Sequence, residues 1–148
     1  MPRLPIEIRR GDHPPSIQVG HPVEAVRFLS QISLASLTGL TAYRRVILDS
    51  GAPISLLPST YWRAAAYVPF GRTQVGGIAA RAECRIPATL SEIHCTLSDG
   101  AAVIGPLKMY AYLAETDSAP ALLGVSGFIR SGILHIGVDA AEAYLEMP

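Results

Sequence analysis

Glycine and proline divide this sequence into short segments, and no other feature restricts its fold as much. The chain has 13 Gly and 12 Pro among 148 residues; proline ends helices and glycine weakens them. The segments between them are mostly apolar and rich in β-branched or aromatic residues, without a helical period. Because a chain of this length suits one hydrophobic core, we expect a single domain that is mainly β.

Several segments have the composition of strands. In residues 107–113, apolar side chains alternate with Lys108, Tyr110 and Tyr112, which indicates a strand with one buried face. Ser98-Asp99-Gly100 is typical of a tight turn between two strands. The other expected strands cover residues 6–9, 28–37, 43–48, 72–86 (as a hairpin), 88–97, 101–104, 133–138 and 143–147.

One loop and two short helical segments are also expected. Gly11, Pro14 and Pro15 indicate a loop near the N-terminus. Ser59 can cap a short helix that continues into the alanines after Trp62, since alanine is the best helix former. A helical turn is expected over residues 126–131, ending before a glycine.

The charge balance argues against a nucleic-acid partner. Lys plus Arg and Asp plus Glu are each 12, so the formal net charge is zero. No block of basic residues is present that would follow a phosphate backbone. Only 16% of the residues are charged and 49% are hydrophobic, which favours a surface that associates with a second copy of the chain.

Neither a membrane segment nor a cofactor pattern stands out. No segment offers about 18 uncharged apolar residues, and the start lacks the apolar core of a signal peptide, so we expect a cytoplasmic location and no membrane partner. Cys84 and Cys95 fit no disulfide framework or zinc pattern and resemble small buried hydrophobes. The four histidines share no ligand spacing with a carboxylate or a cysteine. We therefore expect no metal and no other cofactor.

One aspartate is notable because a strongly apolar segment leads directly to it. Val46-Ile47-Leu48 precedes Asp49, and Ser50-Gly51-Ala52 follows. By itself such an aspartate usually closes a turn by accepting backbone hydrogen bonds. Two features favour a functional role: the apolar triplet before Asp49 and the later segment Ala121-Leu122-Leu123-Gly124. Between them, the paired glycines of Val75-Gly76-Gly77-Ile78 suit a hairpin tip.

In this order the three elements resemble the retropepsin-like aspartic proteases. Their sequence pattern is most similar to that of the bacterial single-domain members of the family. In that family an apolar strand leads to a catalytic Asp-Thr/Ser-Gly-Ala loop, a glycine-rich flap follows, and an apolar-apolar-Gly segment crosses beneath the loop. The resemblance implies a closed, β-barrel-like acid protease domain over residues 28–148, with a flap hairpin and one or two short helices. Residues 1–27 would be an N-terminal arm or strand, or a prosegment removed by self-cleavage.

The implied activity is that of an aspartic endopeptidase acting on polypeptides. Hydrolysis of a peptide bond by water needs a base to remove a proton from the water and an acid to protonate the carbonyl oxygen. Two carboxylates that share one proton can supply both. One chain offers one such aspartate, because Asp99, Asp117 and Asp139 lack both the apolar triplet and the following Ser/Thr-Gly. The second carboxylate would be Asp49 of another subunit in a twofold homodimer.

The resemblance also assigns roles to individual residues. Asp49 would hold the water, the Ser50 hydroxyl would reach across the twofold axis, and the Gly51 carbonyl would accept a substrate amide. Ala52 would flank the cleft. The residues expected to close over an extended peptide are Val75, Gly76, Gly77 and Ile78. Apolar pockets for substrate side chains are expected from Ile54, Leu56, Ile78 and Ile104.

Two departures from the family pattern remove an expected brace of the dimer, and a non-enzymatic alternative stays open beside the protease. Many retroviral members have an acidic residue after the Ala and an arginine after the later Gly, and these two brace the dimer. This chain has Pro53 and Val125 at those positions. The alternative is a catalytically silent retropepsin-like module that serves dimerisation or peptide binding.

A serine hydrolase is a weaker alternative. Gly124-Val125-Ser126-Gly127 begins like the G-x-S-x-G turn, but Phe128 stands where the last glycine would be. His135 follows in the chain, yet it alternates with apolar neighbours as a strand residue does.

Overall fold

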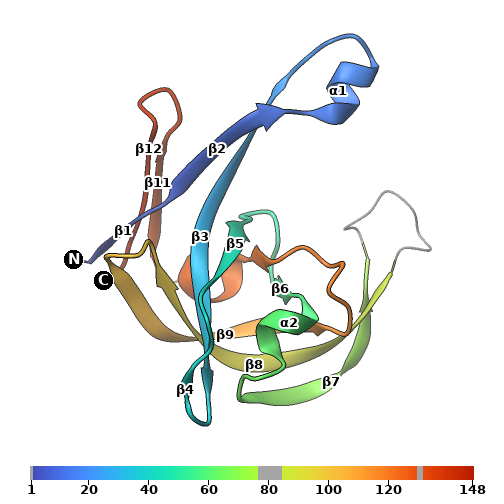
Figure 1. The fold of residues 1–148 in the computed structure, drawn as a ribbon, viewed down its shortest axis with the longest axis vertical. Coiled ribbons are helices and arrows are strands. Elements are labelled where there is room, and N and C mark those ends of the chain that lie inside the picture. Colours follow the sequence, from blue (N-terminus) through green and yellow to red (C-terminus); the bar gives the residue numbers. More distant parts are fainter. Residues whose placement is uncertain (1, 77–84, 130–131) are drawn as a thin grey trace.

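The protein is mainly β, as the sequence predicts. The computed structural model describes residues 2–76, 85–129 and 132–148. Short helical segments interrupt the strands (Figure 1). They are α1 (Pro14–Gln18), α2 (Ser59–Trp62) and a wide turn, η1 (Val125–Ile129). The strands are β1 (Arg3–Pro5), β2 (Glu7–Asp12), β3 (Glu24–Ser36), β4 (Gly39–Leu40), β5 (Arg44–Leu48), β6 (Ser55–Leu57), β7 (Tyr67–Val75), β8 (Ile86–Ser98), β9 (Val103–Ala114), β10 (Leu122–Leu123), β11 (Ile133–Gly137) and β12 (Glu142–Glu146).

The larger sheet closes on itself. Its strands are hydrogen-bonded in the order β2-β3-β5-β10-β6-β9-β8-β7, and β3 also pairs with β8. Six strands, β3, β5, β10, β6, β9 and β8, therefore form a ring around most of the core. The large side chains that are almost fully buried there are Ile32, Leu34, Val46, Leu57, Ile93, Leu97, Met109, Leu113 and Leu123. Alternate side chains of the same strands point away from this core.

The turn between β8 and β9 has the chemistry that the sequence predicts. The Asp99 carboxylate accepts hydrogen bonds from the backbone N–H groups of Ala101 at 2.9 Å and Ala102 at 2.6 Å. These bonds lower the pKa of Asp99. Gly100 has a φ of 99°, a conformation that glycine adopts without steric cost.

A long hairpin of β7 and β8 extends from the ring on the side opposite to β11 and β12 (Figure 1). Its last described pair is Val75 with Ile86. Gly77 and Ile78, which were predicted to belong to a flap, lie outside the described residues, as does Cys84.

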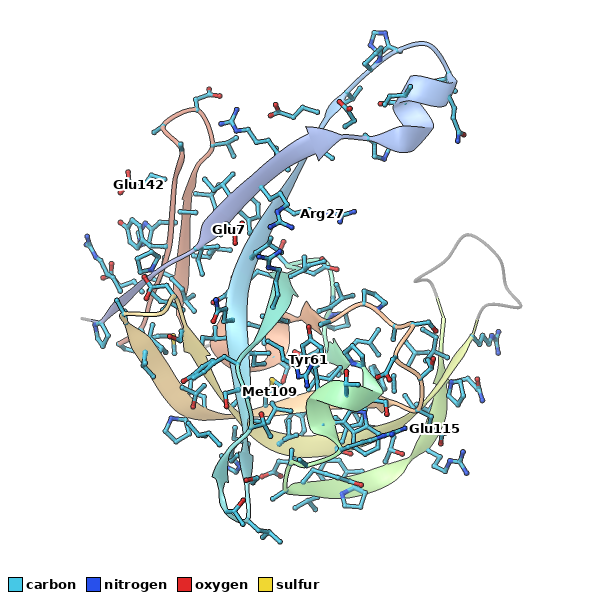
Figure 2. All side chains as sticks on the ribbon, in the orientation of Figure 1. Glu7, Arg27, Tyr61, Met109, Glu115 and Glu142 are labelled. Atoms are coloured by element: carbon cyan, nitrogen blue, oxygen red, sulfur yellow. The ribbon has the colours of Figure 1, made fainter. Side chains whose placement is uncertain are left out.

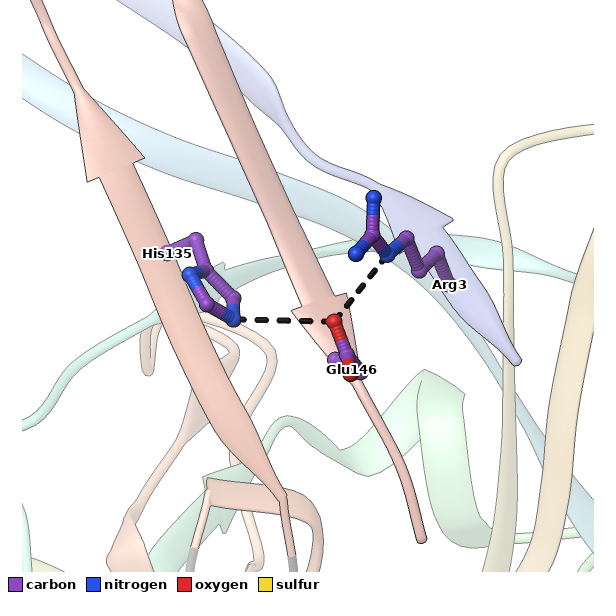
Figure 3. A network of polar contacts seen from close by, with 3 residues as sticks. All are labelled: Arg3, His135 and Glu146. Atoms are coloured by element: carbon purple, nitrogen blue, oxygen red, sulfur yellow. Dashed lines mark hydrogen bonds and ion pairs between the residues drawn. The ribbon is translucent and has the colours of Figure 1, made fainter. Parts of the chain in front are cut away.

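A smaller sheet joins the two ends of the chain, in the order β1-β12-β11. Arg3 Nε donates a hydrogen bond to Glu146 at 3.0 Å, and His135 Nε2 lies 3.7 Å from the same carboxylate oxygen (Figure 3). The His135 ring stacks on Tyr144, with the ring centroids 4.3 Å apart. Leu4 of β1 is fully buried, so the N-terminal strand is part of the core.

Three local expectations are wrong. Pro14 and Pro15 begin the short helix α1 instead of a loop, because proline fits the first helical turn, where the missing N–H costs nothing. Helix α2 ends at Trp62, since the Ala66 N–H donates to the Ala35 carbonyl instead of continuing a helix. The predicted turn over residues 126–131 is not a regular helix over its described part, because Ser126 and Gly127 have non-helical dihedral angles.

The burial of Cys95 gives a test of the core. Cys95 is fully buried, and its Sγ lies 3.4 Å from the Met109 sulfur. Burial raises the pKa of this thiol far above its usual range, and the thiolate is the reactive form. We expect no alkylation of Cys95 by iodoacetamide in the native protein and full alkylation in urea, read from the peptide that contains Cys95 by mass spectrometry. Rapid native alkylation would contradict the closed ring.

Candidate active site

Asp49 lies directly beyond the end of β5, where main-chain bonds to β10 hold the backbone. β10 runs parallel to β5, with Leu122 opposite Ile47 and Leu123 opposite Leu48. The N–H of Ile47 donates to Ala121 at 3.0 Å, and the N–H of Asp49 donates to Leu123 at 2.9 Å. The aspartate is therefore fixed by main-chain bonds to a segment far away in the sequence.

The loop after Asp49 folds back on the carboxylate. Asp49 Oδ1 accepts the backbone N–H of Gly51 at 2.9 Å, and the Asp49 carbonyl accepts the N–H of Ala52 at 3.2 Å. The structure describes no hydrogen bond to the second carboxylate oxygen, Oδ2. Asp49 is half-buried and Ser50 is exposed. One oxygen thus shapes the loop, while the other has no hydrogen-bond partner among the described residues.

The segment after β10 crosses under this loop at very close range. A Cβ on Gly124 would lie 2.6 Å from the Ala52 carbonyl oxygen and 2.8 Å from the Ile54 carbonyl carbon. The Gly124 N–H donates to the buried Ser55 hydroxyl at 2.9 Å. The N–H of Val125 donates to the Ala52 carbonyl at 2.8 Å. Only glycine allows the two backbones to approach this closely.

A cleft of about 720 Å³ opens over this loop. Asp49, Gly51 and Ala52 line it on one side, and Val75 and Gly76 line it from the end of β7. The structure therefore brings together five of the residues that the sequence predicts for the site.

Of the predicted pocket residues, Ile54 and Leu56 line the cleft. Ile104 does not line it, and this prediction is wrong: Ile104 is only 6% exposed and packs in the core of the ring.

The floor of the cleft is a row of side chains in register across neighbouring strands. Ile47 lies opposite Leu122, Leu122 opposite Leu56, and Leu56 opposite Tyr112. All four line the cleft. The floor is thus apolar next to the carboxylate, as an extended peptide with apolar side chains would require.

Arg27, Gln74 and Tyr112 also line the cleft, although no sequence pattern predicts them as site residues. Each lies in a strand, β3, β7 or β9, that only long-range pairing brings to Asp49. No local motif marks these positions.

Ser50 faces a different space. It lines a second hollow of about 620 Å³ together with Pro53, Tyr110, Val125 and Ser126. We call this the loop hollow. It shares Gly51, Pro53 and Ile54 with the cleft, so the two spaces lie on either side of the same loop.

The described residues give no support to the serine hydrolase alternative. His135 is a strand residue of β11 that contacts Glu146 and Tyr144. Within the described ranges, no group of three or more His, Cys, Asp or Glu side chains is arranged to hold a metal ion. No helix of the described part is long and apolar enough to cross a bilayer.

Glycine at position 124 provides a test of this arrangement. We expect Gly124→Ala to destabilise the protein by about 1–3 kcal/mol, because its Cβ would overlap backbone atoms that are themselves hydrogen-bonded. The free energy of unfolding would be measured in urea. Gly71→Ala is the matched control: Gly71 also lies in a strand, has open space around it, and should change stability by less than about 0.5 kcal/mol. Equal effects of the two substitutions would contradict the close crossing.

Comparison of the chain with protein-family models, with curated proteins and with solved structures finds no match.

Proposed function

We propose that the protein is an aspartic endopeptidase of the retropepsin-like type, which hydrolyses peptide bonds as a homodimer. The observation that carries the proposal is the cleft over Asp49. A carboxylate with one uncommitted oxygen, an apolar floor and the end of the β7–β8 hairpin meet in one space. These are the parts needed to hold an extended peptide against a carboxylate.

The requirement for a second carboxylate supports the homodimer. Among the described residues that line the cleft, Asp49 is the one acid. Asp99 is held in the β8–β9 turn, and Asp117 accepts the Thr60 N–H at 2.7 Å. Asp139 lies between β11 and β12.

A twofold axis beside the exposed Ser50 would bring a second Asp49 to the first, and the loop hollow leaves room for the partner's loop.

The chemistry would follow from the pairing. Two carboxylates in contact cannot both ionise, so the pair holds one proton and titrates as a unit. The ionised member removes a proton from the bound water, and the protonated member donates to the carbonyl oxygen of the scissile bond. The internal bond from Gly51 to Asp49 Oδ1 would fix the orientation of each carboxylate.

A silent peptide-binding or dimerisation module is the second candidate, and the same internal bond favours it. Because Asp49 Oδ1 accepts the Gly51 N–H, the aspartate has a role in loop structure that an inactive protein would also need. The cleft would then bind a peptide without cleaving it.

Substitution of Asp49 by asparagine separates the two candidates. Asparagine keeps a carbonyl oxygen for the Gly51 N–H, so Asp49→Asn should fold and dimerise normally, but it cannot share a proton. We expect the wild type to cleave members of a peptide library between mildly acidic and neutral pH. The variant should be slower by at least about a hundredfold. Products would be read by mass spectrometry at concentrations that favour dimers.

The outcomes of this experiment are distinct. Cuts made by the wild type alone support the protease. If both proteins are folded dimers and neither cuts any peptide, the protease proposal fails and the binding module replaces it. Equal cleavage by both proteins would indicate a contaminating protease.

The dimer gives a further prediction at Ser50. In the proposed dimer its hydroxyl reaches the partner's loop, and serine loses more rotamer freedom there than the β-branched threonine would. We expect Ser50→Thr to lower the dimer dissociation constant by roughly threefold, measured by sedimentation velocity. Equal constants for the two proteins would remove this role of Ser50.

A further inference from the structure

The cleft continues into a smaller hollow that is lined by arginines. This hollow has a volume of about 240 Å³ and lies over β2, β3 and β5. Arg9, Arg27 and Arg45 line it around an apolar base that includes Leu29 and Tyr61. We call it the basic hollow. It shares Arg27, Ile47 and Pro120 with the cleft, so the two spaces are continuous.

Strand register places the three arginines on one face of the sheet. Arg9 of β2 lies directly opposite Arg27 of β3. Leu29 follows Arg27 by two residues in β3 and lies opposite Ile47 of β5. Arg45 precedes Ile47 by two residues in β5. Because alternate residues of a strand share a face, all of these side chains point to the side that carries the cleft floor. Figure 2 shows Arg27 extending from β3 on the side away from β11 and β12.

The positive charge of this face is only partly balanced. Arg9 Nη2 lies 3.2 Å from Glu7 Oε1, and both side chains are about half exposed. Arg27 and Arg45 form no ion pair with any residue that the structure describes. Like charges directly opposite each other on neighbouring strands are unfavourable, and an anion between them removes the repulsion. The Arg9–Arg27 pair is therefore suited to a carboxylate ligand.

Arg27 lies close to the candidate catalytic residue without neutralising it. The last β3–β5 pair is Phe28 with Leu48, and the same register continued by one residue would set Arg27 opposite Asp49. Both residues line the cleft, yet the described ion pairs do not include one between them. The guanidinium is thus available to a group that enters the cleft.

The base of the basic hollow is fixed, whereas its rim is exposed. Leu29 is only 4% exposed. The Tyr61 hydroxyl donates to the Arg45 carbonyl, and burial raises the pKa of Tyr61, so the phenol stays protonated. The methylene groups of a glutamate could rest on this base while its carboxylate reaches the guanidinium groups, which bind carboxylates with two parallel hydrogen bonds.

We propose that the basic hollow is a specificity subsite that binds an acidic side chain of the peptide substrate. The inference rests on the proposed function, since the peptide must lie along the floor of the cleft to reach it. In a twofold dimer the hollow occurs twice, so an acidic preference appears at matching positions on both sides of the cut bond. Arg27 carries most of the selectivity, because it lines both spaces.

Paired peptides with Glu or Gln at one position test the subsite. For the wild type we expect kcat/KM to be about tenfold higher for the Glu peptide at low salt, and the ratio to fall as salt rises. Arg27→Gln should bring the ratio close to one, and Arg27→Glu should favour a Lys peptide instead. Arg63→Gln is the matched control, since Arg63 is exposed and lines neither space, and it should keep the wild-type ratio.

Three results would overturn the subsite. The first is cleavage by the wild type with no acidic preference at any position. The second is an acidic preference that Arg27→Gln retains. The third is an equal loss for the Glu and Gln peptides in Arg27→Gln with a shifted pH profile, which would assign Arg27 to the Asp49 pair instead of the substrate.

A binding measurement tests the subsite independently of whether the protein cleaves peptides. Asp49→Asn protein would be titrated into fluorescein-labelled Glu and Gln peptides from the library, and anisotropy would be recorded. Tighter binding of the Glu peptide, lost in the Asp49→Asn/Arg27→Gln double variant, supports the subsite even if no cleavage occurs. Equal binding of the two peptides overturns it.

Discussion

The fold depends on one close approach of two backbone segments beneath Asp49. Gly124 lies so near to Ala52 and Ile54 that any Cβ at position 124 would overlap their backbone atoms. This contact allows β10 to lie between β5 and β6, parallel to the first and antiparallel to the second. β10 has only two residues, yet it is the strand that joins these two parts of the ring. A side chain at position 124 would force the segment that follows β10 and the loop that precedes β6 to move apart.

The same pairing divides the apolar residues between the core and the cleft. Val46 and Leu48 are buried in the ring, while Ile47 between them lines the cleft. In β10, Leu123 is fully buried and Leu122 lines the cleft. Both faces of these strands are thus in apolar surroundings, which explains why the sequence before Asp49 is continuously apolar instead of alternating. The motif that marks the site is therefore also a consequence of where the strand lies.

Features that depend on a few neighbouring residues were predictable from the sequence. The alternation over residues 107–113 and the turn at Asp99 and Gly100 are present where the pattern indicates them. The close association of Asp49 with Gly124 came from a resemblance, not from local chemistry. Features that depend on register over long separations cannot be predicted from local patterns: Arg27 reaches the cleft, and Ile104 does not, because of pairings that no local pattern specifies.

In each of the two Arg-Arg pairs of the sequence, the adjacent arginines have different surroundings, because they lie in strands. Arg9-Arg10 and Arg44-Arg45 lie in strands, so the members of each pair point to opposite faces. Arg10 donates to the Val138 carbonyl, and the Arg44 guanidinium lies 5.7 Å from the Tyr61 ring centroid, so both have partners within the fold. Arg9 and Arg45 line the basic hollow beside Arg27. In a chain with few charges, this gathers cations in a hollow beside the cleft and its apolar floor, where a carboxylate would relieve their repulsion.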